Sequence, residues 1–151
     1  MGKGWFMGVV LAGLLAGCSA TPPLDYSGGD RATAHGSPVI GPRWTLILIG
    51  TSKRWRHDRT PYFEVVPQGG ELRLVGFDGC NRLNGLVRLE SGERFAVDDL
   101  ASTRMACPHH EDAEKVGAIL EGSYRYLIDH DRLVLFGRDS RVLGGFRRGG
   151  P

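Results

Sequence analysis

The chain has 151 residues, of which 41% are hydrophobic, 24% charged and 9% aromatic, with a formal net charge of +2. These values are ordinary for a globular protein and exclude a wholly disordered chain, a coiled coil and a collagen-like fibre. The length leaves no room for a two-domain cofactor enzyme, and the near-neutral charge argues against a dedicated nucleic-acid binder.

Residues 1–17 have the layout of a secretory signal peptide. Lys3 gives a positive start, and residues 5–15 are apolar or glycine throughout. About eleven such residues are too few for a membrane-spanning helix, which needs roughly 20. We therefore expect this segment to be cleaved.

The signal ends in Leu15-Ala16-Gly17-Cys18, which resembles the lipobox of bacterial lipoproteins. The resemblance implies fatty acyl chains such as palmitate on Cys18, and more than one chain makes membrane attachment stable. The alternative is an ordinary signal peptide with an incidental cysteine. Ser19 is similar to the sorting residue of lipoproteins of the outer membrane. We thus expect a lipid-anchored protein of the cell envelope, on the outer membrane and facing the periplasm.

A lipidated N-terminus and flexible linker is expected over residues 18–42. Of the 24 residues 19–42, 13 are Pro, Gly, Ser or Thr, and no hydrophobic periodicity is found. The expected folded domain covers residues 43–147, and residues 148–151 are a tail.

The domain reads as short strands separated by turn signals at intervals of about ten residues, which favours antiparallel pairing. We expect about eight strands, at residues 44–49, 62–66, 71–77, 86–89, 94–97, 124–128, 132–136 and 141–146. In 71–77, Leu72 and Leu74 are placed on one face and Glu71 and Arg73 on the other. Such strands can form a curled sheet or an incomplete barrel.

One amphipathic helix is expected between Pro108 and Gly122, because apolar residues recur there at three- and four-residue spacing. Gly117 inside it is less favourable than alanine by about 1 kcal/mol, so we expect close packing against a neighbour at this position. The fold class is therefore α+β, an antiparallel sheet with one packed helix.

Two further cysteines follow Cys18 along the chain. Cys80 lies in a glycine-containing loop, and Cys107 comes just before the helix. Because export places both in an oxidising compartment, we expect a disulfide between them. The alternative is a pair of buried free thiols.

The blocks Gly79-Cys80-Asn81-Arg82 and Ser102-Thr103-Arg104-Met105-Ala106-Cys107 resemble the META domain, found in heat-inducible bacterial lipoproteins of the HslJ type. The similarity extends over most of residues 43–146. It implies a small α+β domain in the envelope, connected with heat or envelope stress and with antibiotic tolerance. It implies no established enzymatic activity.

The candidate binding residues are polar side chains of these two blocks, which a disulfide would bring together. They are Asn81, Arg82, Ser102, Thr103 and Arg104. Convergent donors of this kind can hold an anion or a peptide carbonyl. The alternative is that Asn81 and Thr103 satisfy loop backbone groups while an arginine packs over the sheet.

Residues 107–111 contain one cysteine and two histidines, His109 and His110. Adjacent histidines at a helix start point in different directions, and zinc usually needs about four well-spaced ligands, so we expect neither a metal nor another cofactor. A thiol/His-dependent envelope enzyme is the alternative, although a disulfide would silence both thiols.

The basic run within residues 51–60 is expected to be a solvated loop, with contact to anionic lipid headgroups as the alternative. The expected function is non-catalytic binding of an envelope protein, a peptide or a small amphipathic ligand, with membrane attachment through the lipid and no nucleic acid.

Overall fold

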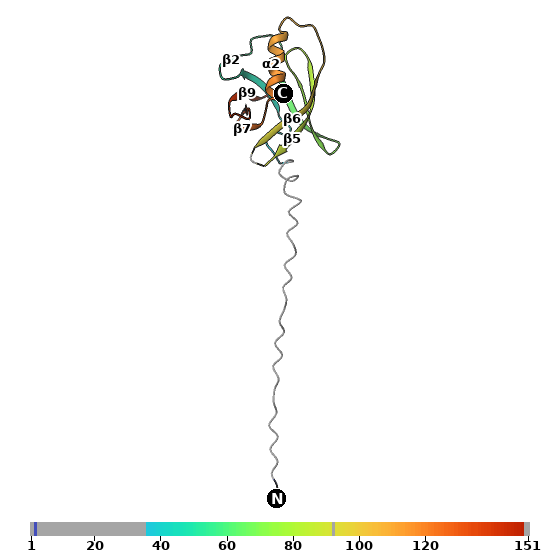
Figure 1. The fold of residues 1–151 in the computed structure, drawn as a ribbon, viewed down its shortest axis with the longest axis vertical. Helices are drawn as coiled ribbons and strands as arrows, with labels where there is room; N and C mark the ends of the chain where they lie inside the picture. The colour runs from blue at the N-terminus through green and yellow to red at the C-terminus, as the bar shows by residue number, and fades with distance from the viewer. Residues whose placement is uncertain (1, 3–35, 92, 150–151) are drawn as a thin grey trace.

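The computed structural model describes residues 2, 36–91 and 93–149. Apart from Gly2, the expected signal peptide lies outside the described residues, and so does the lipidation site at Cys18. The described part contains nine strands and one helix (Figure 1). These are β1 (Arg43–Ile49), β2 (Lys53–Arg54), β3 (Tyr62–Gln68), β4 (Glu71–Phe77), β5 (Arg82–Glu90), β6 (Arg94–Ser102), α2 (His110–Glu121), β7 (Arg125–Asp129), β8 (Arg132–Phe136) and β9 (Val142–Gly149).

The strands form one antiparallel sheet in the order β2-β1-β3-β4-β5-β6-β7-β8-β9. Because β1 also pairs with β9, the sheet curls into a ring. The contact between β6 and β7 is short, with a single registered pair at Arg94 and Arg125. The α+β class, the antiparallel pairing and the single helix are confirmed.

The core lies inside the ring, because alternate residues of each strand point inward. In β3, Phe63 and Val65 are fully buried, whereas Tyr62 and Glu64 lie on the outer face. The aromatic centre of the core consists of Trp44, Phe63, Phe95 and Phe146, none of them more than 1% exposed. The alternation expected for residues 71–77 is also found, with Leu72 and Leu74 buried.

Helix α2 begins two residues after Pro108 and buries the apolar side that the sequence predicted. Val116, Ile119 and Leu120 join the core, and α2 contacts β6 and β1. The expectation of close packing at Gly117 is wrong, since no atom of the described residues lies within 4 Å of the position that a Cβ would occupy there. No helix in the described ranges is long and apolar enough to cross a membrane.

The folded part includes residues that composition grouped with the linker. Val39 is fully buried, and its carbonyl accepts a hydrogen bond of 3.0 Å from Trp44 Nε1. The amide of Gly41 donates to the carbonyl of Val65. A short apolar pair between prolines and glycines has no periodicity, which is why the sequence pattern did not place it in the domain.

Candidate functional site

The expected disulfide is present and joins the two family blocks. Cys80 and Cys107 are bonded, with their Cα atoms 5.9 Å apart. The bond ties the loop after β4 to the segment 103–107 that leads into α2, which we call the strap. Both sulfurs are used in the bond, so neither is a thiolate in this structure.

The loop around Cys80 is organised by a buried carboxylate that the sequence reasoning missed. Asp78 is 4% exposed, and its Oδ1 accepts hydrogen bonds from the backbone amides of Cys80 and Asn81. Its Oδ2 accepts from Asn81 Nδ2 at 3.3 Å. An aspartate two residues before the cysteine in a glycine loop is a typical signal for such a turn.

Asn81 and Thr103 tie this loop to the strap. Asn81 Oδ1 accepts from the Met105 amide at 2.8 Å and from Thr103 Oγ1 at 3.4 Å. Thr103 Oγ1 accepts from the Arg82 amide at 3.0 Å, and the Thr103 amide donates to the Arg82 carbonyl. Asn81 and Thr103 therefore form hydrogen bonds with loop backbone groups, which was the alternative to ligand binding for these two residues.

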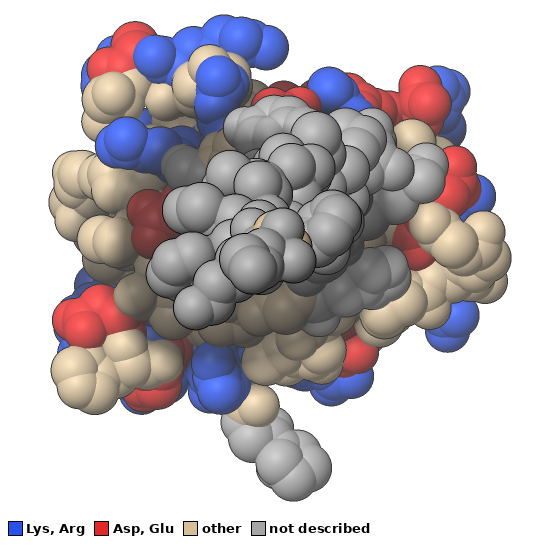
Figure 2. All heavy atoms as spheres, turned by 90° about the horizontal axis from the view of Figure 1, so that it is seen from below, with Lys and Arg blue, Asp and Glu red and all other residues tan. Residues whose placement is uncertain are grey.

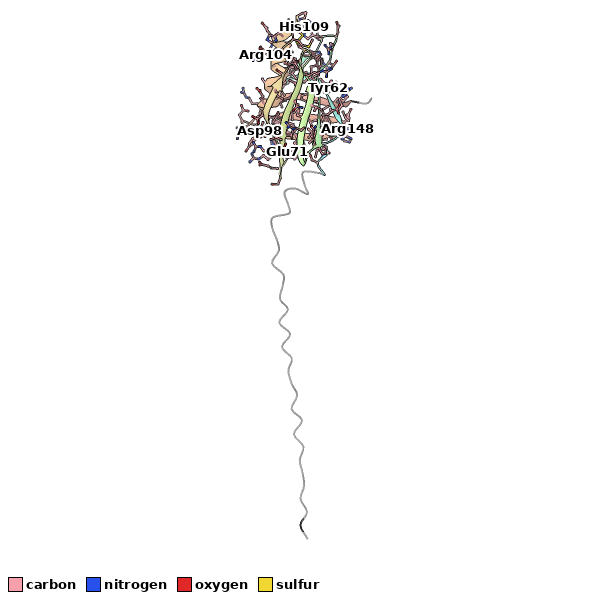
Figure 3. The ribbon with its side chains drawn as sticks, turned by 90° about the vertical axis from the view of Figure 1, so that its right-hand side faces the viewer. Tyr62, Glu71, Asp98, Arg104, His109 and Arg148 are labelled. Atoms are coloured by element: carbon pink, nitrogen blue, oxygen red, sulfur yellow. A yellow bond between two sulfur atoms is a disulfide. The ribbon has the colours of Figure 1, made fainter. Side chains whose placement is uncertain are left out.

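The five candidate binding residues do not converge on one point. Arg82 borders a hollow on the outer face of the sheet, whereas Asn81 and Arg104 border a second hollow of about 700 Å³ between the strap and α2. Ser102 and Thr103 border both hollows. Figure 3 places Arg104 and His109 at one end of the ring and Glu71 at the other.

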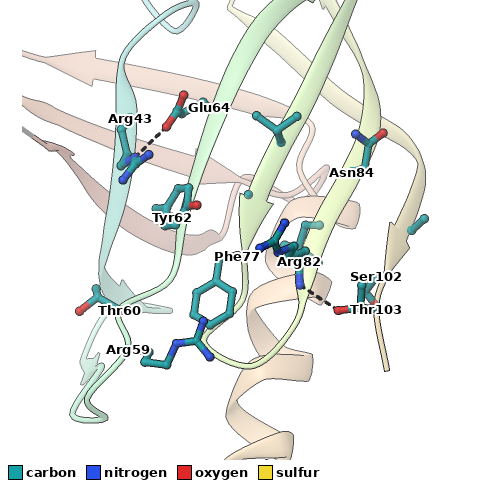
Figure 4. A pocket seen from close by; sticks show the side chains of 14 residues that line it. Arg43, Arg59, Thr60, Tyr62, Glu64, Phe77, Arg82, Asn84, Ser102 and Thr103 are labelled. Carbon is teal, nitrogen blue, oxygen red and sulfur yellow. Dashed lines mark hydrogen bonds and ion pairs between the residues drawn. The ribbon is translucent and has the colours of Figure 1, made fainter. Parts of the chain in front are cut away.

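The hollow on the outer face, which we call the outer groove, has a volume of about 950 Å³ and crosses β3 to β6 (Figure 4). Its lining residues are Arg43, Arg59, Thr60, Tyr62, Glu64, Val75, Gly76, Phe77, Arg82, Leu83, Asn84, Ala101, Ser102 and Thr103. Strand register fixes two rows of side chains across it. The first row is Tyr62, Phe77 and Arg82, and the second is Glu64, Val75, Asn84 and Ala101.

Arginines cover both aromatic rings of the first row. The guanidinium carbon of Arg43 lies 4.2 Å from the Tyr62 ring centroid, and that of Arg59 lies 4.2 Å from the Phe77 centroid. Arg43 also donates to Glu64 at 2.7 Å, and this hydrogen bond raises the pKa of Arg43. Within the described part of the chain, Arg59 forms no ion pair, and neither does Arg82.

Arg59 belongs to residues 51–60, which we call the basic loop, and this loop packs on the site. Trp55 is half-buried against Gly79, and its Nε1 donates to the Arg59 carbonyl at 2.9 Å. The ring of His57 stacks on that of His109 with centroids 3.5 Å apart. The sequence predicted that the basic loop is solvated. Most of its residues are exposed, but Trp55 packs on the cysteine loop and covers part of it.

The basic loop is attached to α2 through Asp112. This carboxylate bonds to Lys53, to His57 Nε2 at 3.0 Å and to Lys115 at 3.0 Å. Hydrogen bonds from Lys53, His57 and Lys115, in that order of importance, hold the pKa of Asp112 well below its ordinary range. The described residues contain no group of three or more His, Cys, Asp or Glu side chains arranged to hold a metal ion.

On the face that Figure 2 shows, Lys and Arg side chains are interspersed with Asp and Glu around the grey atoms.

A curled antiparallel sheet with one helix, with its loops tied by a disulfide and an open groove on the sheet face, defines a small α+β domain. The chain belongs to the META domain family, whose model matches residues 37–149. This match confirms the family that the two sequence blocks predicted.

Two solved structures share the fold. A protein from Burkholderia xenovorans, determined by NMR, is 20% identical with a TM-score of 0.60, over 80% of this chain and 89% of that chain. A second NMR structure is also 20% identical, with a TM-score of 0.54 over 71% of this chain and 88% of that chain. A comparison with curated proteins found no match.

Proposed function

We propose that this protein is a lipid-anchored module of the cell envelope whose META domain binds a ligand at the outer groove without catalysis. The observation that carries the proposal is the groove itself. Two of its arginines, Arg59 and Arg82, lack ion-pair partners in the described residues, and they lie in the part of the groove that contains Tyr62 and Phe77. Asn81 and Thr103 hold the loops that border it.

The sequence supports the cellular setting of this proposal. The lipobox-like segment before Cys18 supports a lipid anchor, and Ser19 supports the outer membrane with the domain facing the periplasm. The disulfide is in keeping with an oxidising compartment. A role in envelope or heat stress, or in antibiotic tolerance, is the part of the proposal that comes from the family resemblance alone.

The thiol/His-dependent enzyme needs a different chemical state of the chain. A thiolate nucleophile requires reduction of the bond between Cys80 and Cys107. No contact in the described structure favours that state, so binding is the function that we propose.

The test is to recover the acylated full chain from membranes in a mild non-ionic detergent and to identify what copurifies by mass spectrometry. The intact mass should show a chain that begins at Cys18 and carries acyl groups. Replacing Ala101, an exposed groove residue, with tryptophan should fill the groove and remove the copurifying molecule. Leu127→Trp is the matched control, because Leu127 is 46% exposed on β7 and does not line the groove. Equal recovery of the same molecules with both variants would contradict groove binding.

A further inference from the structure

We propose that the ligand of the outer groove is a small amphipathic anion, with a carboxylate or phosphate ester held by Arg59 and Arg82 and an apolar body lying over Val75 and Ala101. This inference rests on the proposed function and adds the chemical class of the ligand. It follows from strand register, from the arginine positions and from the size of the groove.

Register places the two arginines beside the same aromatic ring. Phe77 is the direct cross-strand partner of Arg82, and neighbouring strands are roughly 4.8 Å apart. The guanidinium carbon of Arg59 lies 4.2 Å from the centroid of Phe77. Figure 4 shows both guanidinium groups beside this ring, at the end of the groove where the basic loop meets β4 and β5. One anionic group can therefore reach both side chains.

The charges in the groove favour an anion. Its lining contains three arginines and one carboxylate, that of Glu64, and this carboxylate is bonded to Arg43. The guanidinium groups of Arg59 and Arg82 are exposed and form no ion pair in the described ranges. A planar guanidinium presents paired N–H donors that match the oxygens of a carboxylate or a phosphate. A cationic ligand would meet two uncompensated positive charges at this end.

The second row of the groove contributes two apolar side chains to its floor, Val75 and Ala101. Val75 and Ala101 flank Asn84 across β4, β5 and β6. The alanine side chain is short and exposed, so it leaves space above the sheet. Asn84 is exposed between them and offers one amide for orientation. A ligand with its anionic end at the arginines extends its apolar part over this row.

The size of the groove agrees with a small ligand. Its volume of about 950 Å³ is near the upper end of the roughly 300–1,000 Å³ typical of small-molecule sites. Its lining side chains come from five adjacent strands, β1, β3, β4, β5 and β6, and from the basic loop.

The test uses water-soluble probes with the acylated full chain in non-ionic detergent, measured by titration calorimetry. Phenyl phosphate represents the amphipathic anion, inorganic phosphate its head alone, phenyl glucoside a neutral analogue and benzyltrimethylammonium a cationic one. We expect phenyl phosphate to bind most tightly, inorganic phosphate more weakly, and the neutral and cationic probes not at all. Binding of phenyl phosphate should weaken as salt increases.

Variants identify the site. Arg59→Gln and Arg82→Gln should each weaken phenyl phosphate binding by about tenfold, the effect expected for loss of a charge-assisted hydrogen bond. Arg132→Gln is the matched control, because Arg132 is an exposed arginine of β8 that does not line the groove. Thermal unfolding of each variant checks that the fold is kept.

The outcomes separate this inference from the proposed function. If Ala101→Trp removes a copurifying ligand while both arginine variants and the control bind it equally, the groove binds but the anionic class is wrong. If phenyl glucoside binds as tightly as phenyl phosphate, the anionic class is also wrong. If Ala101→Trp affects neither the copurifying molecule nor phenyl phosphate, the groove itself is not the binding site, and both proposals fail.

Discussion

The indole of Trp55 lies directly against Gly79, in the space that a side chain at residue 79 would need. A Cβ added to Gly79 would come within 2.3 Å of Trp55 Cζ2. Gly79 also has a φ of 103°, in the region that glycine favours. This contact anchors the basic loop on the cysteine loop, and it thereby positions Arg59 over Phe77 at the groove.

Gly79→Ala should therefore destabilise the domain strongly. Backbone strain at a positive φ and a steric clash each contribute about 1–3 kcal/mol, so we expect the free energy of unfolding to fall by roughly 2–6 kcal/mol. Gly41→Ala is the matched control, because Gly41 has a similar φ of 98° but no atom from the described part of the chain within 4 Å of its Cβ position. Denaturant unfolding measures the free energy of unfolding of both variants. An equal decrease in the two would show that the contact with Trp55 does not contribute to the effect of Gly79→Ala.

Loss of the disulfide should lower stability without changing the fold. The bond between Cys80 and Cys107 spans 27 residues. Closing a loop of this length stabilises the native state by roughly 3–4 kcal/mol on the chain-entropy model. Replacing both cysteines with alanine should lower the free energy of unfolding by about that amount, and reductant should have the same effect on the wild-type chain only. A double variant as stable as the oxidised wild type would contradict this expectation.

Asn81 should prove to be a structural residue and not a ligand contact. Its buried amide joins Asp78 to the Met105 backbone, so Asn81→Ala leaves buried polar groups without partners and should cost about 2–3 kcal/mol. Arg82→Gln, next in the chain, changes an exposed side chain and should leave stability within about 0.5 kcal/mol. The two variants should therefore separate stability from affinity, with phenyl phosphate binding reduced by Arg82→Gln and kept by folded Asn81→Ala.

The strands were predictable where one face of a segment is buried in the ring. Residues 71–74 alternate between polar and apolar, and the structure has a strand over Glu71–Phe77. Strand β2 was missed because Lys53 and Arg54 are both exposed, and only their pairing with β1 marks them as a strand. Val39 was missed because two apolar residues among prolines and glycines are too few to show a period.

The sequence predicted the parts of the site that depend on residue type and on neighbours in the chain. The cysteine pair was predicted from the number of cysteines and the expected oxidising compartment, and the nearness of the two family blocks followed from that pair. The binding of loop backbone groups by Asn81 and Thr103 was the alternative that the sequence left open. The position of Arg59 over Phe77 could not be predicted, because it depends on how the basic loop packs on Gly79. The placement of Arg82 and Arg104 in different hollows likewise depends on the direction of each side chain in space.

Asp112 should make the attachment of the basic loop sensitive to acid. Its folded-state pKa lies below the ordinary 3.8, chiefly because of the hydrogen bond from Lys53. The stabilisation is therefore complete above that ordinary value and is lost as the pH falls through the lower, folded-state pKa. Because the partner lysines are about half exposed, we expect Asp112→Asn to cost only about 1 kcal/mol at neutral pH.

The difference in unfolding free energy between the wild type and Asp112→Asn should be smaller below about pH 4 than at neutral pH. Denaturant unfolding at a series of pH values measures this. Glu114→Gln is the control, since the Glu114 side chain is 66% exposed and, among the described residues, pairs only with His110. A difference that grows as the pH falls would contradict the assignment.

Gly117 offers a test of whether the helix needs its glycine. Within residues 36–91 and 93–149 nothing lies within 4 Å of its Cβ position, so Gly117→Ala adds a methyl group to open space there and should raise the free energy of unfolding by up to about 1 kcal/mol. Gly144→Ala is the contrasting variant, because its Cβ would come within 3.0 Å of Ile119 Cδ1 and should destabilise the contact between β9 and α2. Residue 117 also borders the hollow between the strap and α2. If Gly117→Ala destabilises the protein, the helix must pack more closely at this position in solution, and the sequence-based expectation of a close neighbour would be restored.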